Sequence, residues 1–141
     1  MITIDVNLTQ PEFGFTAADE AGKTITMDTS PADGGNGYGV RPMQALLMGL
    51  GGCSGIDIVS ILKKKRQTLT SFKMVISGER EQGKVPSLWE KVHVVFYLNG
   101  DIGEEQAQHA ASLSIDKYCS VAETLRRSGC KVTWEVKLNQ L

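Results

Sequence analysis

One long segment with almost no charge restricts the fold of this chain more than any other feature. Between Met43 and Leu62 the only charged side chain is Asp57, and Pro42 just before it suits the first turn of a helix. Apolar residues would cover nearly every side of this helix, which is typical of a helix buried in a core. Its uncharged part is shorter than the roughly 20 residues that span a bilayer. We therefore expect a long buried helix over residues 43–66 that ends in basic side chains.

Segments of alternating apolar and polar residues flank this helix in blocks. The strictest alternation runs over residues 2–8 and predicts a half-buried strand. The same pattern predicts five further strands, around residues 13–15, 25–27, 72–76, 92–98 and 130–138. Capping boxes at residues 101–104 and 120–123 predict two short helices. The order β-β-β-α-β-β-α-α-β favours an α+β fold with antiparallel sheets around a buried central helix, and 141 residues fit one domain, residues 1–141.

The charge balance and the amino terminus bear on partners and compartment. With 15 basic and 16 acidic side chains, the formal net charge of -1 gives no reason to expect nucleic acid or a membrane as a partner. The first residues lack the basic region and apolar run of a signal peptide, so we expect a cytoplasmic protein with reduced cysteines. The cysteines form no C-x-x-C pair and only His93 and His109 could join them, so we expect no structural metal.

A glycine-rich loop precedes the long helix. Gly35, Gly37 and Gly39 suggest a dinucleotide-binding loop, but Pro31 separates them from the preceding strand, so the required context is missing. We expect residues 30–41 to form a flexible connection or a lid instead.

Cys53 lies in the middle of the long helix. Gly49, Gly52 and Gly55 are spaced three apart, and we expect them to form a smooth ridge where another backbone can approach. Asp57 follows Cys53 by one helical turn, and a nearby carboxylate disfavours a thiolate. A reactive Cys53 therefore needs a cation from elsewhere in the fold or from a partner chain. Without one, Cys53 would be an inert apolar residue, as buried cysteines usually are.

Cys119 stands just before Ser120, the expected N-cap of a helix. Unpaired amide groups at a helix N-terminus lower the pKa of a thiol, so we expect Cys119 to be reactive. We interpret Cys130 as structural and His93 as a surface residue of its strand. A Cys–His–Asp hydrolase that uses His93 or His109 stays formally open, although no local signature supports it.

Two motifs resemble those of the OsmC-like (OsmC/Ohr) family. Residues 42–66 are similar to the central helix around the family's first cysteine, here Cys53, and residues 116–125 are similar to the segment around its second, here Cys119. The order of elements is similar along essentially the whole chain, and the YhfA-like branch resembles it most. The resemblance implies an OsmC-like fold and an intertwined homodimer in which the central helices pack together.

The resemblance also implies thiol-dependent redox chemistry that reduces hydroperoxides, preferably organic ones. The cysteine at position 53 would attack the peroxide and become a sulfenic acid, and the cysteine at position 119 would condense with it to a disulfide. A dithiol reductant would then restore both thiols. No metal or organic cofactor is implied.

The chain departs from the peroxidatic members in two places. Residues 1–40 hold no arginine, which those members place beside the thiolate, and Met43, followed by Gln44, stands where they have a glutamate. Arg41 could substitute for the arginine, but it lies about 18 Å along the helix from Cys53, so it would act from another chain or a folded-back loop. Met43, Gln44 and Arg41 are our candidate substrate-binding residues. The departures leave an alternative open, a non-catalytic OsmC-like dimer that binds a small ligand.

Overall fold

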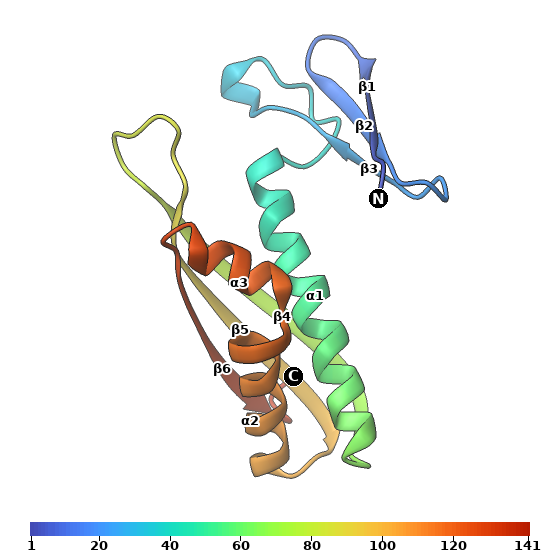
Figure 1. Cartoon of the computed structure of the whole chain (residues 1–141), viewed down its shortest axis with the longest axis vertical. Coiled ribbons are helices and arrows are strands. Elements are labelled where there is room, and N and C mark those ends of the chain that lie inside the picture. Colours follow the sequence, from blue (N-terminus) through green and yellow to red (C-terminus); the bar gives the residue numbers. More distant parts are fainter. The chain divides into compact units, whose positions relative to one another are not determined.

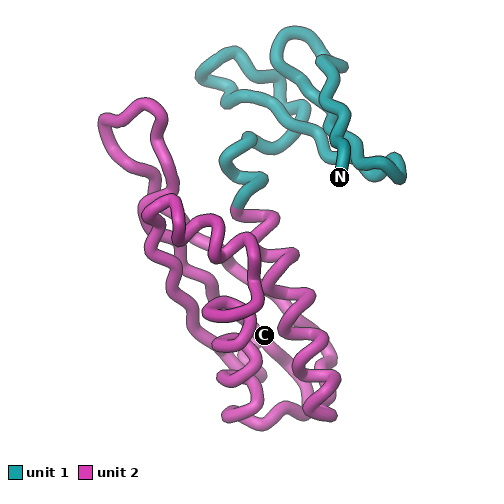
Figure 2. Tube along the Cα trace, viewed as in Figure 1, with its two compact units in different colours: residues 1–46 teal, residues 47–141 magenta.

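The computed structural model describes residues 1–141 and divides into two compact units, Met1–Leu46 and Leu47–Leu141 (Figure 2). The elements along the chain are β1 (Asp5–Gln10), β2 (Gly14–Ala18), β3 (Thr24–Met27), η1 (Pro31–Asp33), α1 (Pro42–Lys64), β4 (Thr68–Arg80), β5 (Trp89–Asp101), α2 (Glu104–Leu113), η2 (Ser114–Tyr118), α3 (Ser120–Arg127) and β6 (Lys131–Leu138) (Figure 1). The predicted α+β order of strands and helices is confirmed, with a 3₁₀ turn at η1 and a π-helical turn at η2 added. That the chain is one domain stays a prediction.

The first unit contains an antiparallel sheet, β1-β2-β3. The strand predicted over residues 2–8 begins at Asp5, and all of its residues are exposed in the single chain. The prediction that this strand is half-buried was wrong for the chain alone, because nothing covers Val6 and Leu8, which are 53% and 57% exposed. The alternation of apolar and polar residues therefore predicted the strand correctly but did not predict its exposure in the single chain.

The glycine-rich loop of this unit folds around a buried carboxylate. Asp28 accepts hydrogen bonds from the backbone N–H groups of Thr29, Asn36 and Tyr38, at 2.7, 2.9 and 3.2 Å. A Cβ on Gly39 would lie 2.2 Å from backbone atoms of β3, so glycine lets the loop approach that strand. Two amides of the loop thus bind a side chain of the protein itself, which agrees with the absence of a phosphate-binding context in the sequence.

The second unit is a sheet with all of its helices on one face (Figure 1). The strand order is β4-β5-β6, and alternate residues of β5 point into the core, as predicted: Val92, Val94, Phe96 and Leu98. β4 and β5 are antiparallel, but β5 and β6 are parallel, which corrects the expectation of purely antiparallel sheets. The reason is that α2 and α3 form a crossover that returns the chain to the starting end of β5.

α1 is buried on one side only. Leu50, Ile58 and Leu62 lie in the core, whereas Ile56 is 73% and Val59 46% exposed. The prediction of a helix buried on nearly every side was therefore wrong for the single chain, because the sheet of this unit covers only one face. α1 has the length and apolar composition to cross a membrane, but a core helix passes the same test, so this is weak evidence for a span.

The glycines of α1 divide between its two faces. A Cβ on Gly55 would lie 3.0 Å from Met74 Cε, and one on Gly51 would also contact a side chain of β4. A Cβ on Gly49 or Gly52 would have no atom within 4 Å outside its own helix. Gly51 and Gly55 thus let α1 approach β4, whereas Gly49 and Gly52 lie on the open side. The predicted ridge of residues 49, 52 and 55 is not one continuous surface.

The two predicted capping boxes lie at the starts of α2 and α3, as expected, but the residues at the N-caps differ from those predicted. α2 begins after Gly103, whose backbone is extended and which has no side chain to cap the helix. The N-cap of α3 is Cys119 and not Ser120, because the backbone is extended at Cys119 and becomes helical at Ser120. Gly129, with φ of 98°, follows the end of α3 as expected. The shift by one residue puts a thiol at the N-terminus of α3.

Candidate active site

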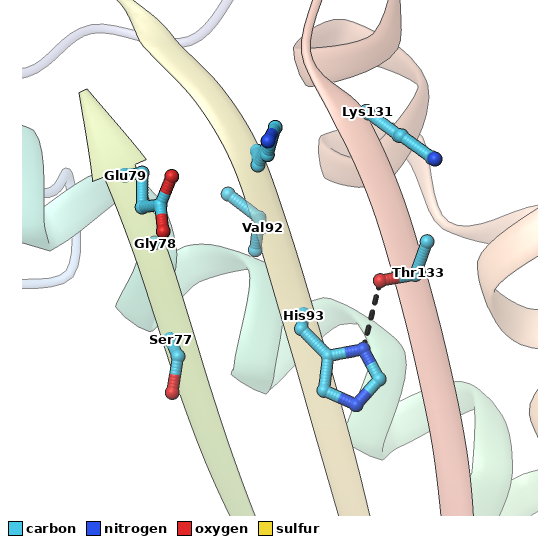
Figure 3. Close-up of a pocket in the computed structure, with 8 residues that line it drawn as sticks. Ser77, Gly78, Glu79, Val92, His93, Lys131 and Thr133 are labelled. Carbon is cyan, nitrogen blue, oxygen red and sulfur yellow. Dashed lines mark hydrogen bonds between the residues drawn. The ribbon is translucent and has the colours of Figure 1, made fainter. Parts of the chain in front are cut away.

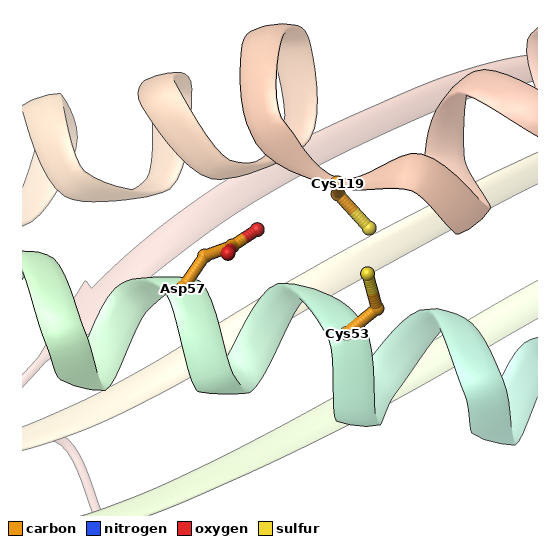
Figure 4. A group of neighbouring side chains, drawn as sticks. All are labelled: Cys53, Asp57 and Cys119. Carbon is orange, nitrogen blue, oxygen red and sulfur yellow. The ribbon is translucent and has the colours of Figure 1, made fainter.

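Two cysteines that are far apart in the sequence face each other in the second unit. Cys53 projects from the middle of α1 and Cys119 from the start of α3, with their sulfur atoms directed at one another (Figure 4). All three cysteines of the chain are free thiols. The two Sγ atoms and a carboxylate oxygen of Asp57 lie within 4.8 Å of one another. The two thiols singled out from the sequence are thus adjacent.

The π-helical turn η2 positions Cys119. The wider turn ends with the N–H of Cys119 donating to the Ser114 carbonyl at 2.7 Å, after which the backbone becomes extended at Cys119. This break between α2 and α3 directs the side chain toward α1 (Figure 4). The thiol then accepts a hydrogen bond from the N–H of Ala122 at 3.4 Å, so it also caps α3.

The two thiols differ in exposure. Cys53 is half-buried, whereas Cys119 is only 2% exposed. Burial raises the pKa of the Cys119 thiol to about 11, the Ala122 N–H opposes this rise, and the neighbouring Cys53 thiol adds to it. The prediction that the helix N-terminus lowers this pKa was therefore wrong, because desolvation outweighs one backbone hydrogen bond. Cys119 is protonated at neutral pH.

Asp57 is the third member of the cluster. Its carboxylate is half-buried and accepts a hydrogen bond from Ser114 Oγ at 3.3 Å, a hydroxyl that also lies 3.1 Å from the Ser54 carbonyl oxygen. Asp57 takes part in none of the ion pairs of the chain. The sequence placed Asp57 one turn from Cys53 but gave no sign of Ser114, because that contact depends on how η2 packs against α1.

A hollow of about 580 Å³ opens beside this cluster. Its lining includes Asp57, Lys64 and Lys65 from the C-terminal half of α1 and its end, and Leu113 and Tyr118 from the segment that leads to Cys119. The hollow is therefore a route by which solvent and small solutes reach the carboxylate. Its lysines do not pair with Asp57, and no ion pair neutralises that carboxylate.

The histidines lie apart from the thiols. His93 is on the sheet face opposite the helices, beside a hollow of about 470 Å³ (Figure 3). Its Nδ1 and Nε2 lie 2.7 Å from Thr133 Oγ1 and Glu135 Oε2, so the interpretation as a surface strand residue is confirmed. His109 is exposed on α2. Neither supplies the imidazole of a Cys–His–Asp triad.

The remaining predicted residues have other surroundings. Cys130 is 3% exposed and its Sγ lies 3.8 Å from the Lys131 carbonyl oxygen, so it is part of the core. The N–H of Arg41 donates to Gln44 Oε1 at 3.3 Å at the start of α1, where Met43 is half-buried. Because these three residues belong to the first unit and the thiols to the second, their role in substrate binding stays a prediction.

The chain is similar to known proteins over most of its length. Residues 34–135 match the family of OsmC-like proteins. Protein YhfA of Escherichia coli (strain K12) is 35% identical over 115 residues, which cover 81% of this chain and 82% of that protein.

Solved structures have the same fold. A hypothetical protein from Aquifex aeolicus VF5 is 33% identical with a TM-score of 0.80, and the match covers 98% of this chain and 97% of that one. An organic hydroperoxide resistance protein OsmC from Legionella pneumophila is 13% identical with a TM-score of 0.73, and the match covers 97% and 96%. The match of sequence and fold over both cysteine segments shows that this chain belongs to the OsmC-like protein family.

Proposed function

We propose that this protein is a thiol-dependent redox protein that reduces hydroperoxides, preferably organic ones, through Cys53 and Cys119. The observation that carries the proposal is the pair of free thiols facing each other across α1 and α3. The OsmC-like family includes proteins named for organic hydroperoxide resistance, such as that of Legionella pneumophila. We place the activity in the cytoplasm, where all three cysteines start as thiols.

We assign the roles of the two thiols from their different exposure. Half-buried Cys53 is open to a peroxide, whereas buried and protonated Cys119 is a poor nucleophile. Cys53 attacks the outer oxygen of the hydroperoxide, the O–O bond breaks, and the products are a sulfenic acid and an alcohol. The Cys119 sulfur then attacks the sulfenic sulfur, releasing water and leaving a Cys53–Cys119 disulfide. A dithiol reduces this disulfide and becomes oxidised itself.

A second function is favoured by the carboxylate beside the thiols. Asp57 stands where a peroxidase would need a cation, residues 1–40 hold no arginine, and position 43 is methionine. These features suit a non-catalytic dimer that holds a small apolar or thiol-bearing ligand near Cys53. The two functions differ in whether the thiols change their oxidation state.

We also propose that the protein acts as a homodimer joined through the open face of α1. Ile56 and Val59 form an apolar surface there, next to a hollow of about 600 Å³ that also includes Gly52. Glycine at positions 49 and 52 lets another backbone come close to this face. A second copy of α1 would remove these apolar side chains from water.

The deciding experiment adds one equivalent of cumene hydroperoxide to the reduced protein and maps its cysteines by mass spectrometry. We expect a rapid Cys53–Cys119 disulfide that a dithiol reverses. Cys53→Ser should abolish turnover, Cys119→Ser should leave a Cys53 sulfenic acid that dimedone traps, and Cys130→Ala is the matched control that keeps turnover. Turnover that survives in Cys53→Ser contradicts the proposal. Two unmodified thiols in the wild-type protein favour the ligand-binding function.

A further inference from the structure

The thiol pair lies in a site whose charges are not balanced. Cys53, Cys119 and Asp57 each carry a negative charge when ionised, and their ligand atoms lie within 4.8 Å of one another. No ion pair involves Asp57. A carboxylate outside any ion pair, beside two thiols that lose their protons when a metal binds, can hold a cation, and two sulfur donors favour a soft or borderline one.

The spacing of the three atoms is close to that of a metal site. Zinc binds thiolate sulfur at about 2.3 Å and carboxylate oxygen at about 2.0 Å, so tetrahedral geometry separates neighbouring ligand atoms by about 3.5 to 3.8 Å. The three atoms lie within 4.8 Å of one another, so their separations exceed those of a zinc site by at most about 1 Å.

Groups that orient the ligands are already present. Ser114 Oγ lies 3.3 Å from Asp57 Oδ2, and the N–H of Ala122 donates to Cys119 Sγ at 3.4 Å. Hydrogen bonds of this kind fix the direction of a ligand atom and contribute to metal affinity. The hollow of about 580 Å³ beside Asp57 supplies a path by which an ion can reach the carboxylate.

We propose that the reduced protein binds one thiophilic divalent metal ion, such as Zn²⁺, through Cys53 Sγ, Cys119 Sγ and a carboxylate oxygen of Asp57. Binding releases the two thiol protons to solvent, forms two metal–sulfur bonds and one metal–oxygen bond, and leaves every oxidation state unchanged. The metal-bound sulfurs cannot join as a disulfide, so the metal-bound form is protected from oxidation. No zinc motif is visible in the sequence because the ligands come from α1 and from the start of α3, which are far apart along the chain.

The test titrates Co²⁺ into the reduced, metal-free protein without any peroxide. We expect one equivalent to give the thiolate-to-cobalt charge-transfer band and the visible bands of a tetrahedral site, and Zn²⁺ to displace it. Cys53→Ser, Cys119→Ser and Asp57→Asn should each lose or weaken these bands, whereas the control Cys130→Ala keeps them. Ser114→Ala should weaken binding roughly tenfold or more, because the carboxylate loses its orienting hydroxyl.

Two results would overturn this proposal. One is the absence of charge-transfer bands with the folded, reduced wild-type protein, and the other is binding that survives in both cysteine variants. Circular dichroism of each variant shows whether it is folded. Because no peroxide is present, the titration tests metal binding alone. Metal binding can fail while peroxide reduction is confirmed, and peroxide reduction can fail while metal binding is confirmed. If the zinc-loaded protein forms the Cys53–Cys119 disulfide more slowly than the metal-free protein, then metal binding protects the same thiols that react with peroxide.

Discussion

Cys119 is subject to two opposing influences on its acidity. The N-terminus of α3 stabilises a negative charge, and burial disfavours it. At 2% exposure burial prevails, and the pKa of Cys119 rises to about 11. A buried protonated thiol is slow to attack a peroxide, yet it stands next to Cys53, where a sulfenic acid would form. Its position therefore suits the second step of the proposed reaction and not the first.

The first prediction concerns the relative reactivity of these thiols. In reduced protein with a chelator present, iodoacetamide should modify Cys53 before Cys119 at pH 8. Modification of Cys119 should accelerate about tenfold per pH unit as the pH rises, because the thiolate fraction grows in that way below the pKa. Peptide mass spectrometry at several pH values measures both rates. Faster modification of Cys119 at neutral pH would contradict the role assigned here.

Asp28 illustrates a different effect at the residue scale. Backbone N–H groups, first that of Asn36, lower the pKa of its carboxyl group. A lowered pKa in the folded state stabilises the fold above the unfolded pKa of about 3.9. This contribution disappears as the pH falls through the lower, folded-state pKa.

The second prediction therefore compares the wild-type protein with Asp28→Asn. The melting temperature of the variant should be lower at pH 7, because a neutral amide accepts these hydrogen bonds less strongly. The difference should shrink as the pH falls below about 4. Thermal unfolding followed by circular dichroism at several pH values measures it, and Asp33→Asn, on an exposed residue of the same loop, is the control. A difference that does not change with pH would contradict the role of the carboxylate charge.

At the scale of elements, α3 depends on the same side chain that we place in the chemistry. Cys119 Sγ accepts a hydrogen bond from the N–H of Ala122 and is the side chain that caps the N-terminus of this helix. A disulfide would draw the Cys119 sulfur closer to Cys53 and remove its thiol, which would weaken this cap. The start of α3 is therefore the part of the second unit that we expect to change most between the reduced and oxidised forms.

The third prediction separates the cap from the chemistry. Cys119→Ser keeps an acceptor at the N-cap, whereas Cys119→Ala removes it. We expect Cys119→Ala to be less stable than Cys119→Ser by about 1 kcal/mol, the usual contribution of an N-cap side chain. Urea unfolding measures the difference, and neither variant should form the disulfide. Equal stabilities would mean that the sulfur contributes little as a cap.

At the scale of the whole molecule, the single chain exposes apolar side chains that its sequence predicted to be buried. They lie on the open face of α1, at Ile56 and Val59, and on β1, at Val6 and Leu8. Exposed apolar surfaces of this kind mark interaction sites. We expect the open face of α1 to be covered by a second copy of the chain.

The fourth prediction tests this assembly. Ile56→Asp should convert a dimer to a monomer at micromolar concentration, because the dimer would bury an unpaired charge. Val75→Asp is the matched control, since Val75 is 39% exposed on the sheet face that α1 does not cover. Size-exclusion chromatography with light scattering measures the mass. A wild-type monomer, or a dimer that persists in Ile56→Asp, would contradict the proposed interface.

The sequence by itself determined the succession of strands and helices, the two cysteines and the family. These are local properties. Alternation marks a strand because side chains alternate across a sheet, and an uncharged segment opened by proline and closed by lysines marks a helix. The proximity of Asp57 to Cys53 is local as well, because the two residues lie one helical turn apart on α1.

The tertiary structure decided what depends on neighbours from distant parts of the chain. The parallel pairing of β5 and β6, the open face of α1 and the raised pKa of Cys119 each arise from packing. The π-helical turn η2 moved the N-cap to Cys119 and brought Ser114 to Asp57, so one site now holds two thiols and a carboxylate. No local pattern encodes such a site, because burial and charge balance are set by the atoms that surround a residue in space and not by those beside it in the sequence.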